Sequence, residues 1–398
     1  MAISARIREQ LVKASFIRRM FEEGEQLKRI HGPERVFDFT LGNPSVEPPP
    51  AFSRRLLELA SRQVPGMHRY MSNAGYTESR RAVAEVLRAR SGMGFTDNHV
   101  LMTCGASGAL NVILKTILNP GDEVIILAPY FVEYVFYIDN HGGVPRVVPT
   151  REEDFQIDVG AVAAAIGPRT RAVIINSPNN PTGVVYRAGV LRELGDLLRS
   201  RQKELGSPIY LISDEPYARI VYDGVVPPCI FDFYENTIVA NSFSKDLSLA
   251  GERIGYLAVS PRVTGLELLM EGLTFSNRVL GFVNAPALMQ RVVAGLLDEA
   301  VDLSQYRENR DTLYNSLTEM GYRMIRPQGA FYLFPRSPIP DDVEFVRAAQ
   351  RHNLLLVPGS GFGTPGYFRL AYCVPREVVT RSLPAFAALA AEFGLPHG

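Results

Sequence analysis

The chain has 398 residues, of which 46% are hydrophobic and 21% charged, a composition that suits one or two globular domains with a large buried core. Its 42 basic residues balance 42 acidic residues, so no net positive field exists to bind nucleic acid or an anionic membrane surface. The cysteines Cys104, Cys229 and Cys373 lack the CxxC spacing of a metal or redox site, which favours a reducing cytoplasm. We therefore expect a small-molecule ligand and no metal.

Neither the N-terminal segment nor the longest apolar stretch predicts a membrane span. Apolar residues recur at helical spacing between positions 7 and 30 and predict one amphipathic helix. The alternative for this basic segment is a transit peptide, but the periodicity continues through the acidic positions 22–25. The stretch 124–138 is broken by Pro129 and Glu133 and is too short to cross a bilayer, so we interpret it as a strand, a turn and a helix.

Further along the chain, short β-rich runs alternate with helical stretches. Between about residues 100 and 260 these runs are VLMT, EVIIL, RVVP, AVII, IYLI, TIVA and IGYLAVS. The helical stretches include 109–118 and 191–204, and the alternation predicts βαβ units in a largely parallel sheet covered by helices on both faces. Beyond about residue 290 a long polar helix up to Glu319 and the runs AFYLF, LLLVP and YFRLAY indicate a smaller α+β unit.

Four of the runs end in polar, turn-rich clusters: VLMT in CGASG, AVII in NSPNNPTG, IYLI in SDEPY and TIVA in NSFSK. Ligands of open parallel sheets bind beyond the carboxyl ends of the strands. We therefore expect the four clusters to converge on one crevice.

The first cluster, CGASGAL, is a small-residue turn that opens a helix, where free backbone N–H groups and the helix dipole can bind a phosphate. The alternative is an ordinary helix N-terminus capped by Ser107. Ser242 and Arg253, near the last cluster, could donate further hydrogen bonds to a phosphate, or could simply lie at the end of a surface strand.

Asp214 follows an apolar run, so its carboxylate needs a cationic or hydrogen-bonding partner. It could cap a helix, or it could keep a pyridine nitrogen protonated, as an acidic residue does in pyridoxal phosphate enzymes. Asn180 and Tyr217 could then donate hydrogen bonds to a phenolate oxygen of the same ring, although NPTG is also good turn chemistry by itself.

Lys245 stands between small hydroxyl residues at the end of an apolar run, with Arg253 eight positions later. A lysine that forms a Schiff base must be partly neutral. Both apolar surroundings and a neighbouring positive charge favour the neutral amine. Taken alone, a solvated surface lysine is the alternative. Taken with a phosphate cradle, a buried Asp, an Asn and a Tyr, the lysine points to pyridoxal phosphate.

These motifs, in this order, resemble the class I aminotransferases, fold-type-I pyridoxal phosphate enzymes of the aspartate aminotransferase family. SFSKDLSLAGERIGY resembles the family's SxSK segment, which implies that Lys245 forms the Schiff base and that Ser242 and Arg253 bind the phosphate. NSPNNPTG resembles the NPTG signature and SDEPY the DxxY element. The resemblance therefore implies that Asp214 pairs with the pyridinium nitrogen, while Asn180 and Tyr217 contact the phenolate oxygen.

Six further positions match residues that contact the cofactor or the substrate in the family. The resemblance implies phosphate contacts for Ala106 and Ser107, ring stacking for Phe131, a phosphate contact across a homodimer for Tyr70, and α-carboxylate contacts for Arg369 and the backbone of Gly42. Two positions depart from the family. Many relatives have Trp where Phe131 stands, and Glu where LGNP has Asn43, which leaves substrate orientation near the N-terminal segment open.

The resemblance also implies an architecture: an α/β large domain over residues 46–288, with a mostly parallel seven-stranded sheet between helices, and a smaller α+β domain formed by residues 1–45 and 289–398. Arg278 falls near the region from which relatives supply a distal arginine across the dimer. It would favour a dicarboxylic substrate, and its alternative is a surface arginine.

The implied function is ping-pong transfer of an amino group between an L-amino acid and a 2-keto acid, with aspartate and 2-oxoglutarate as one candidate pair. A carbon–sulfur β-lyase or an amino acid decarboxylase of the same fold would keep every cofactor residue. A non-catalytic regulatory module that holds the cofactor is an alternative of another class, although no basic helix-turn-helix segment is evident. A dinucleotide-binding oxidoreductase ranks last, since no GxGxxG follows the first strand.

Overall fold

The computed structural model describes residues 2–62 and 65–396, with residues 12–22 described by their backbone alone. The helices are α1 (Ala5–His31), α2 (Pro50–Arg62), α3 (Thr77–Ser91), α4 (Gly105–Ile117), α5 (Glu133–Asn140), α6 (Val159–Ala165), α7 (Ala188–Leu205), α8 (Phe243–Asp246), α9 (Leu266–Val279), α10 (Ala287–Ala294), α11 (Ser304–Glu319), α12 (Asp342–Arg351) and α13 (Arg376–Glu392). The strands are β1 (Phe37–Asp38), β2 (Val100–Thr103), β3 (Glu123–Ala128), β4 (Val144–Pro149), β5 (Thr170–Asn176), β6 (Tyr210–Asp214), β7 (Thr237–Ser242), β8 (Gly255–Val259), β9 (Tyr332–Leu333), β10 (Leu354–Leu355), β11 (Val357–Pro358) and β12 (Phe368–Ala371).

A seven-stranded sheet forms the centre of the larger part of the molecule. Its strand order is β2-β8-β7-β6-β5-β3-β4, and only β8 runs antiparallel to its neighbours. The register places Asn176 beside Asp214 and Asp214 beside Ala240, so the carboxyl ends of β5, β6 and β7 meet at one edge. Thr103 and Ser242 both pair with Gly255 at the same edge.

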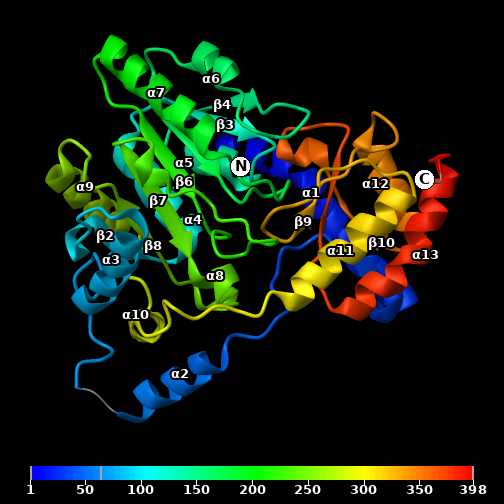
Figure 1. Ribbon diagram of the computed structural model, residues 1–398, viewed down its shortest axis with the longest axis horizontal. Coiled ribbons are helices and arrows are strands. Elements are labelled where there is room, and N and C mark those ends of the chain that lie inside the picture. Colours follow the sequence, from blue (N-terminus) through cyan, green and yellow to red (C-terminus); the bar gives the residue numbers. More distant parts are fainter. Residues whose placement is uncertain (1, 63–64, 397–398) are drawn as a thin grey trace.

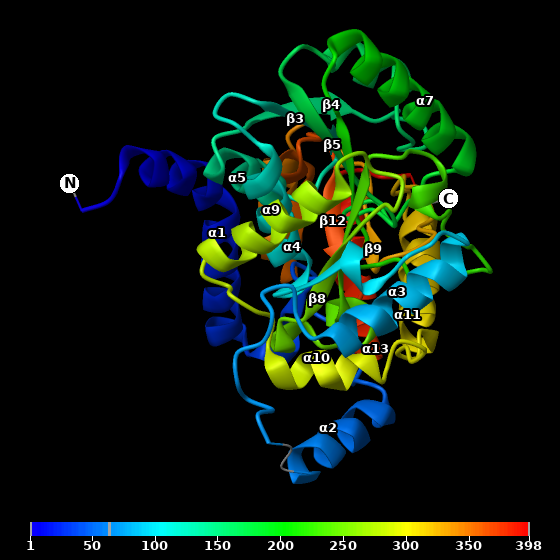
Figure 2. The ribbon, with the colours of Figure 1, turned by 90° about the vertical axis from the view of Figure 1, so that its left-hand side faces the viewer.

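The sheet is apolar on both faces because helices cover both, which explains its continuous Val/Ile runs. On one face α4, α5 and α9 pack on alternate strand residues such as Ile126 and Ile174. On the other face α3, α7 and α10 pack on the intervening residues such as Ile125 and Val173. Figure 2 shows α4, α5 and α9 on one side of the sheet, and α3 and α7 on the other.

Segments from both ends of the chain build a second, smaller core. Strand β1 pairs in parallel with β10, and β9, β11 and β12 form an antiparallel sheet. Phe39 packs in this core with side chains of α11, α12 and α13, and these three helices lie together on one side of the molecule (Figure 1). The expected domain limits of 46–288, with 1–45 and 289–398, stay a prediction.

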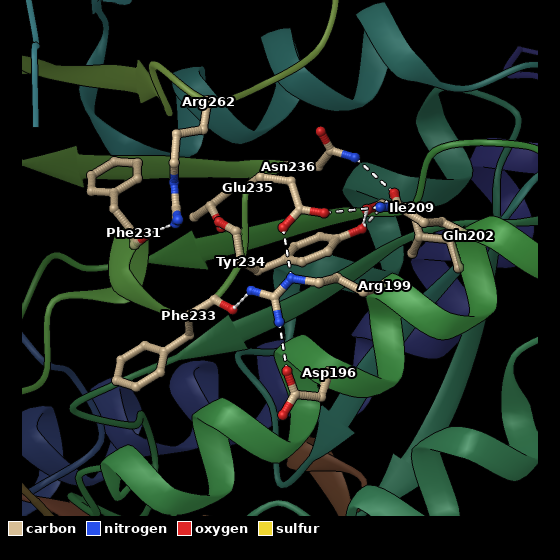
Figure 3. A network of polar contacts seen from close by, with 11 residues as sticks. Asp196, Arg199, Gln202, Ile209, Phe231, Phe233, Tyr234, Glu235, Asn236 and Arg262 are labelled. Carbon is tan, nitrogen blue, oxygen red and sulfur yellow. Dashed lines mark hydrogen bonds and ion pairs between the residues drawn. The ribbon is translucent and has the colours of Figure 1, made fainter.

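Near the amino ends of β6 and β7, away from the polar clusters, a hydrogen-bonded network connects α7 to the segments that precede these strands (Figure 3). Tyr234 donates to the backbone oxygen of Ile209 at 2.8 Å, and Arg199 donates to Glu235 at 2.9 Å and to the backbone oxygen of Phe233. These contacts hold the first residues of β6 and β7 in place. Because the two strands also pair in a defined register, the positions of their carboxyl ends follow.

The main elements agree with the expectations from the sequence. The N-terminal periodicity forms α1, and the stretch 124–138 forms β3, a turn and most of α5. The single polar helix expected from about residue 290 up to Glu319 is wrong at its start: α10 ends at Ala294 and α11 begins only at Ser304, because the connection between them buries Leu296 and Val301. The seven β-rich runs between residues 100 and 260 are the seven strands of the large sheet. In the second core the expected strands are shorter, because only two to four residues of each apolar run pair with a neighbouring strand.

Candidate active site

The four polar clusters and the second core enclose one cavity of about 350 Å³. It lies beyond the carboxyl ends of the parallel strands, where an open α/β sheet offers backbone groups and space to a ligand. Most of the residues singled out from the sequence line it, namely Gly42, Ala106, Ser107, Phe131, Asn180, Asp214, Tyr217, Ser242, Lys245, Arg253 and Arg369. The expected convergence of the clusters is therefore present in the fold.

One side of the cavity is a turn between β2 and α4. Gly105 begins α4 with φ at +73°, a left-handed conformation that suits glycine, and a Cβ atom there would lie 3.1 Å from Nη2 of Arg253. The helix N-terminus thus faces the Arg253 guanidinium at close range. Ser242 is buried at the end of β7, which β8 separates from β2, and its Oγ accepts a hydrogen bond from the backbone N–H of Ser244 at 3.0 Å.

Asp214 ends β6 and is buried at the bottom of the cavity. Tyr134 of α5 donates a hydrogen bond to its Oδ2 at 2.5 Å, whereas its Oδ1 is buried and has no hydrogen-bond partner among the described residues. Burial raises the pKa of this carboxyl to about 7, although the Tyr134 hydrogen bond opposes the shift. The free oxygen and the raised pKa indicate a carboxylate that is incomplete without a cationic or N–H-bearing ligand.

Lys245 lies on α8, directly after β7. Its Nζ donates to the backbone oxygen of Gly42 at 2.6 Å, and it lies 5.6 Å from the centre of the Phe331 ring. Burial lowers the pKa of the Lys245 ammonium to about 8, and the positive charges of Arg253 and Arg369 act in the same direction. A large fraction of this amine is therefore neutral at mildly alkaline pH.

Gly42 belongs to an N-terminal segment that covers the cavity next to Lys245. A Cβ atom at this position would lie only 1.9 Å from the hydroxyl oxygen of Tyr332, so the backbone passes closer to the tyrosine than any side chain would allow. The phenolic oxygens of Tyr332 and Tyr217 are in turn 2.8 Å apart.

Arg369 extends from β12 of the second core into the cavity and is buried. Its guanidinium donates to the amide oxygen of Asn180 at 3.1 Å and to the backbone oxygen of Thr40 at 2.5 Å. The rings of Tyr332 and Phe362 lie 4.8 Å and 4.7 Å from its Cζ. Its Nε has no hydrogen-bond partner among the described residues, and burial lowers the pKa of the group. Arg369 is thus oriented and desolvated, as a carboxylate clamp requires.

Two of the residues singled out from the sequence lie elsewhere. Tyr70 is 89% exposed and lines a separate surface hollow with neighbours such as Phe282. Arg278, in the last turn of α9, lines another surface hollow, where its guanidinium lies 5.2 Å from the ring centre of Phe275. A single copy of the chain does not bring either side chain into the cavity.

Comparison with known proteins agrees with this geometry. The family described as aminotransferase class I and II matches residues 34–386. A probable aspartate/prephenate aminotransferase of Thermus aquaticus is 37% identical over 81% of this chain and 84% of its own length. An aspartate aminotransferase of Thermotoga maritima is 32% identical, with coverages of 88% and 90%.

Solved structures give the same result. An amino transferase from Eubacterium rectale superimposes with a TM-score of 0.95, at 39% identity and 99% coverage of both chains. A Thermus thermophilus aspartate aminotransferase with maleate gives a TM-score of 0.85, at 29% identity and coverages of 98% and 100%.

The chain therefore belongs to the class I and II aminotransferase family, and it is a pyridoxal phosphate-dependent transaminase of fold type I. Its substrates are amino acids and keto acids. Within the described residues, no helix is long and apolar enough to cross a membrane, and no cluster of His, Cys, Asp and Glu has the geometry of a metal site.

Proposed function

We propose that this chain transfers amino groups between an L-amino acid and a 2-keto acid at the cavity around Lys245, by a ping-pong mechanism. The observation that carries the proposal is the pairing of two features in one cavity: an amine with a lowered pKa and a buried carboxylate with one unpartnered oxygen. Pyridoxal phosphate supplies an aldehyde that condenses with amines and a protonated ring that withdraws electrons from the carbon that loses its proton.

The lining residues fit this cofactor. The α4 N-terminus with Ala106 and Ser107, together with Ser242 and Arg253, would hold the phosphate. Asp214 would place its free Oδ1 on the pyridinium nitrogen, Asn180 and Tyr217 would donate to the phenolate oxygen, and Phe131 would cover one face of the ring. Lys245 would form the Schiff base.

The remaining steps belong to the chain's own groups. Arg369 binds the α-carboxylate of the substrate in a bidentate pair, beside the backbone of Gly42, and so fixes which Cα bond faces Lys245. Nζ of Lys245, in its neutral form, would take the proton from the substrate Cα as a general base and then, as a general acid, would deliver it to the carbon atom of the cofactor's aldehyde group. Small-domain residues such as Phe362 and Tyr332 cover the cavity and limit the access of water.

The relatives' names make aspartate the first amino donor to test, and 2-oxoglutarate is the acceptor expected from the sequence. The three cations that line the cavity, Lys245, Arg253 and Arg369, already have roles in this proposal. A second substrate carboxylate would therefore need a cation from a partner subunit, for which Arg278 is the candidate. We further propose a homodimer, in which Tyr70 reaches the partner's phosphate site, and a cytoplasmic location, which suits three free cysteines in the described chain.

A screen of amino donors against 2-oxoglutarate, with analysis of all products, tests the proposed function. Transfer gives a new amino acid and a keto acid, whereas a lyase gives ammonia and pyruvate and a decarboxylase gives carbon dioxide. We expect transfer, and we expect Lys245→Ala to lower its rate at least about 10³-fold, because both the proton carrier and the covalent attachment are lost. Full transfer by Lys245→Ala, or no transfer with any donor, would refute the proposal.

A further inference from the structure

Among the described residues that line the cavity, one charged side chain makes no hydrogen bond and no ion pair. Glu133 begins α5 and lines the cavity directly after Phe131 and Val132. It is half-buried, and within the described part of the chain its carboxylate makes no hydrogen bond and no ion pair. Its pKa is raised by burial alone, with no counter-charge that opposes the shift.

The other charged groups that line the cavity differ from Glu133 in this respect. Lys245 donates to the backbone of Gly42, Arg369 to Asn180 and Thr40, and Arg253 to the backbone of Ala250. Asp214, the remaining acidic group, accepts a hydrogen bond from Tyr134. Each of these four also has a role toward the cofactor or the substrate α-carboxylate in the function proposed above, and Glu133 has none.

Helix stabilisation does not account for where this carboxylate lies. An acidic residue in the first turn of a helix gains from the helix dipole when it faces solvent as well as when it faces a cavity. A half-buried carboxylate without a protein hydrogen bond has lost part of its hydration, and a ligand that brings an N–H donor offsets that loss. Glu133 has an electrostatic influence on Tyr137, one helical turn further, but this tyrosine is a neutral acid and cannot serve as a counter-charge.

We propose that Glu133 selects an amino donor whose side chain ends in an ammonium group or another N–H donor, and that it disfavours a donor with a second carboxylate. The inference rests on the amino-transfer function proposed above and names the substrate class of the same site. A terminal N–H group would satisfy the free carboxylate, whereas a terminal carboxylate would meet a like charge in a partly dry cavity. This preference sets the chain apart from the aspartate-type activity in the names of its relatives.

The test compares the wild-type holoenzyme with Glu133→Gln, which keeps the shape of the side chain and removes its charge. Donors of similar length are L-ornithine, L-glutamine, L-glutamate and the apolar L-norvaline as the reference. We expect Glu133→Gln to lower kcat/KM for ornithine relative to norvaline by about ten- to hundredfold, and to raise the value for glutamate. Glu193→Gln, on the exposed side of α7, is the matched control and should change neither ratio.

A binding measurement gives a readout without turnover. α-Methylornithine and α-methylglutamate have no Cα hydrogen, so they bind but cannot complete transfer. Isothermal titration should show that wild type prefers the first and that Glu133→Gln loses this preference. Glu133→Asp, which restores the charge, should recover part of it.

The outcomes separate the two proposals. If Glu133→Gln transfers amino groups and its kcat/KM ratios between donors equal those of the wild type, the proposed role of Glu133 is wrong. The proposed amino-transfer function would still stand. An equal loss with every donor would also overturn it, because selection requires a difference between donors. Absence of transfer with all four donors in the wild type, together with unchanged α-methyl binding preferences in Glu133→Gln, would remove both proposals.

Discussion

At the scale of single residues, the cavity changes the acidity of the groups that handle protons. Burial and two neighbouring arginines lower the pKa of Lys245 from 10.5 to about 8. The neutral amine, which is the nucleophile, therefore becomes abundant as the pH rises through about 8. We expect the rate at which the apoprotein attaches pyridoxal phosphate to rise with a midpoint near this pH.

Borohydride trapping after short incubations, followed by peptide mass spectrometry, measures this rate at Lys245. Surface lysines in the same digest provide the control and should still gain reactivity at higher pH. A midpoint at pH 10 or above for Lys245 would contradict the desolvated amine.

Asp214 shifts in the opposite sense. Its pKa is 3.8 in the unfolded chain and about 7 in the folded apoprotein, so folding favours the protonated form. Its contribution to stability is full below about pH 4 and is lost as the pH rises toward about 7. We expect the free energy of unfolding of the apoprotein to fall across this window by a larger amount in wild type than in Asp214→Asn.

Urea titrations of apoproteins at several pH values provide the measurement. Asp246 is also buried, with a pKa of about 7, so the difference between wild type and Asp214→Asn is the informative quantity. Asp298→Asn, at an exposed position, should keep the wild-type slope. Added pyridoxal phosphate should flatten the slope in wild type because it provides the missing cationic partner. An identical slope in Asp214→Asn would disprove this assignment.

The sequence alone identified the residues that lie in recognisable motifs. It missed the residues that hydrogen-bond to them, because those contacts are formed only in the folded chain. Lys245 follows a strand of the large sheet and Asp214 ends another, so the rule for parallel sheets located them. Arg369 lies in the antiparallel sheet of the second core, and only the family resemblance of YFRLAY identified it. Tyr134 was missed, since nothing in PYFVEY indicates that its hydroxyl crosses to the end of β6. Tyr332 was missed for the same reason: it lies in an apolar run, and only the fold brings its hydroxyl beside Tyr217.

At the scale of elements, the turn between β2 and α4 couples backbone conformation to ligand binding. Gly105→Ala would place a methyl group near Arg253 and hold alanine at positive φ, at a cost of about 1–2 kcal/mol. We expect lower stability together with weaker affinity for pyridoxal phosphate, because both the helix N-terminus and the guanidinium must shift. Fluorescence titration of the apoprotein measures the affinity.

Gly206→Ala is the matched control. Gly206 ends α7 at a φ of +65°, but a Cβ atom there would meet nothing within 4 Å. It should lose about 1 kcal/mol of stability and keep its cofactor affinity. Equal affinities for the two variants would mean that the turn is not a phosphate site.

Element boundaries were predictable where local signals are strong. The run VLMT coincides with β2, and six strands of the large sheet were found because nearly all of their residues are buried, which gives continuous apolar runs. The edge strand β4 is largely exposed, and the run RVVP covers only its second part. The strands of the second core were overestimated, since runs such as LLLVP are buried on account of helix packing, and only short parts pair. Hydrophobicity alone does not separate these two cases.

At the scale of the whole molecule, one copy leaves surfaces that suit a second copy. Helix α2 lies at the periphery of the molecule in both views (Figures 1 and 2); its Leu59 packs in the main core, whereas its Leu57 is 71% exposed. Leu268 and Phe275 of α9 are also exposed, beside the hollow that contains Arg278. Apolar groups exposed in this way favour association. If association brings Tyr70 to the partner's phosphate site, as proposed, each active site needs residues from two chains.

Mixed dimers test this arrangement directly. Lys245→Ala and Tyr70→Phe chains, co-expressed with different tags and assayed at limiting cofactor, should each be poorly active as homodimers. In a mixed dimer, one site combines the intact Lys245 of one chain with the intact Tyr70 of the other, so about a quarter of all sites should recover.

The control pairs Lys245→Ala with Asp214→Ala. Both of these residues line the cavity of one chain, so no mixed site is complete and no activity should return. The opposite result would contradict the arrangement. If activity returned in the control pair but not in the Tyr70 pair, each site would combine Lys245 and Asp214 from different chains, and Tyr70 would act in the same chain as Lys245.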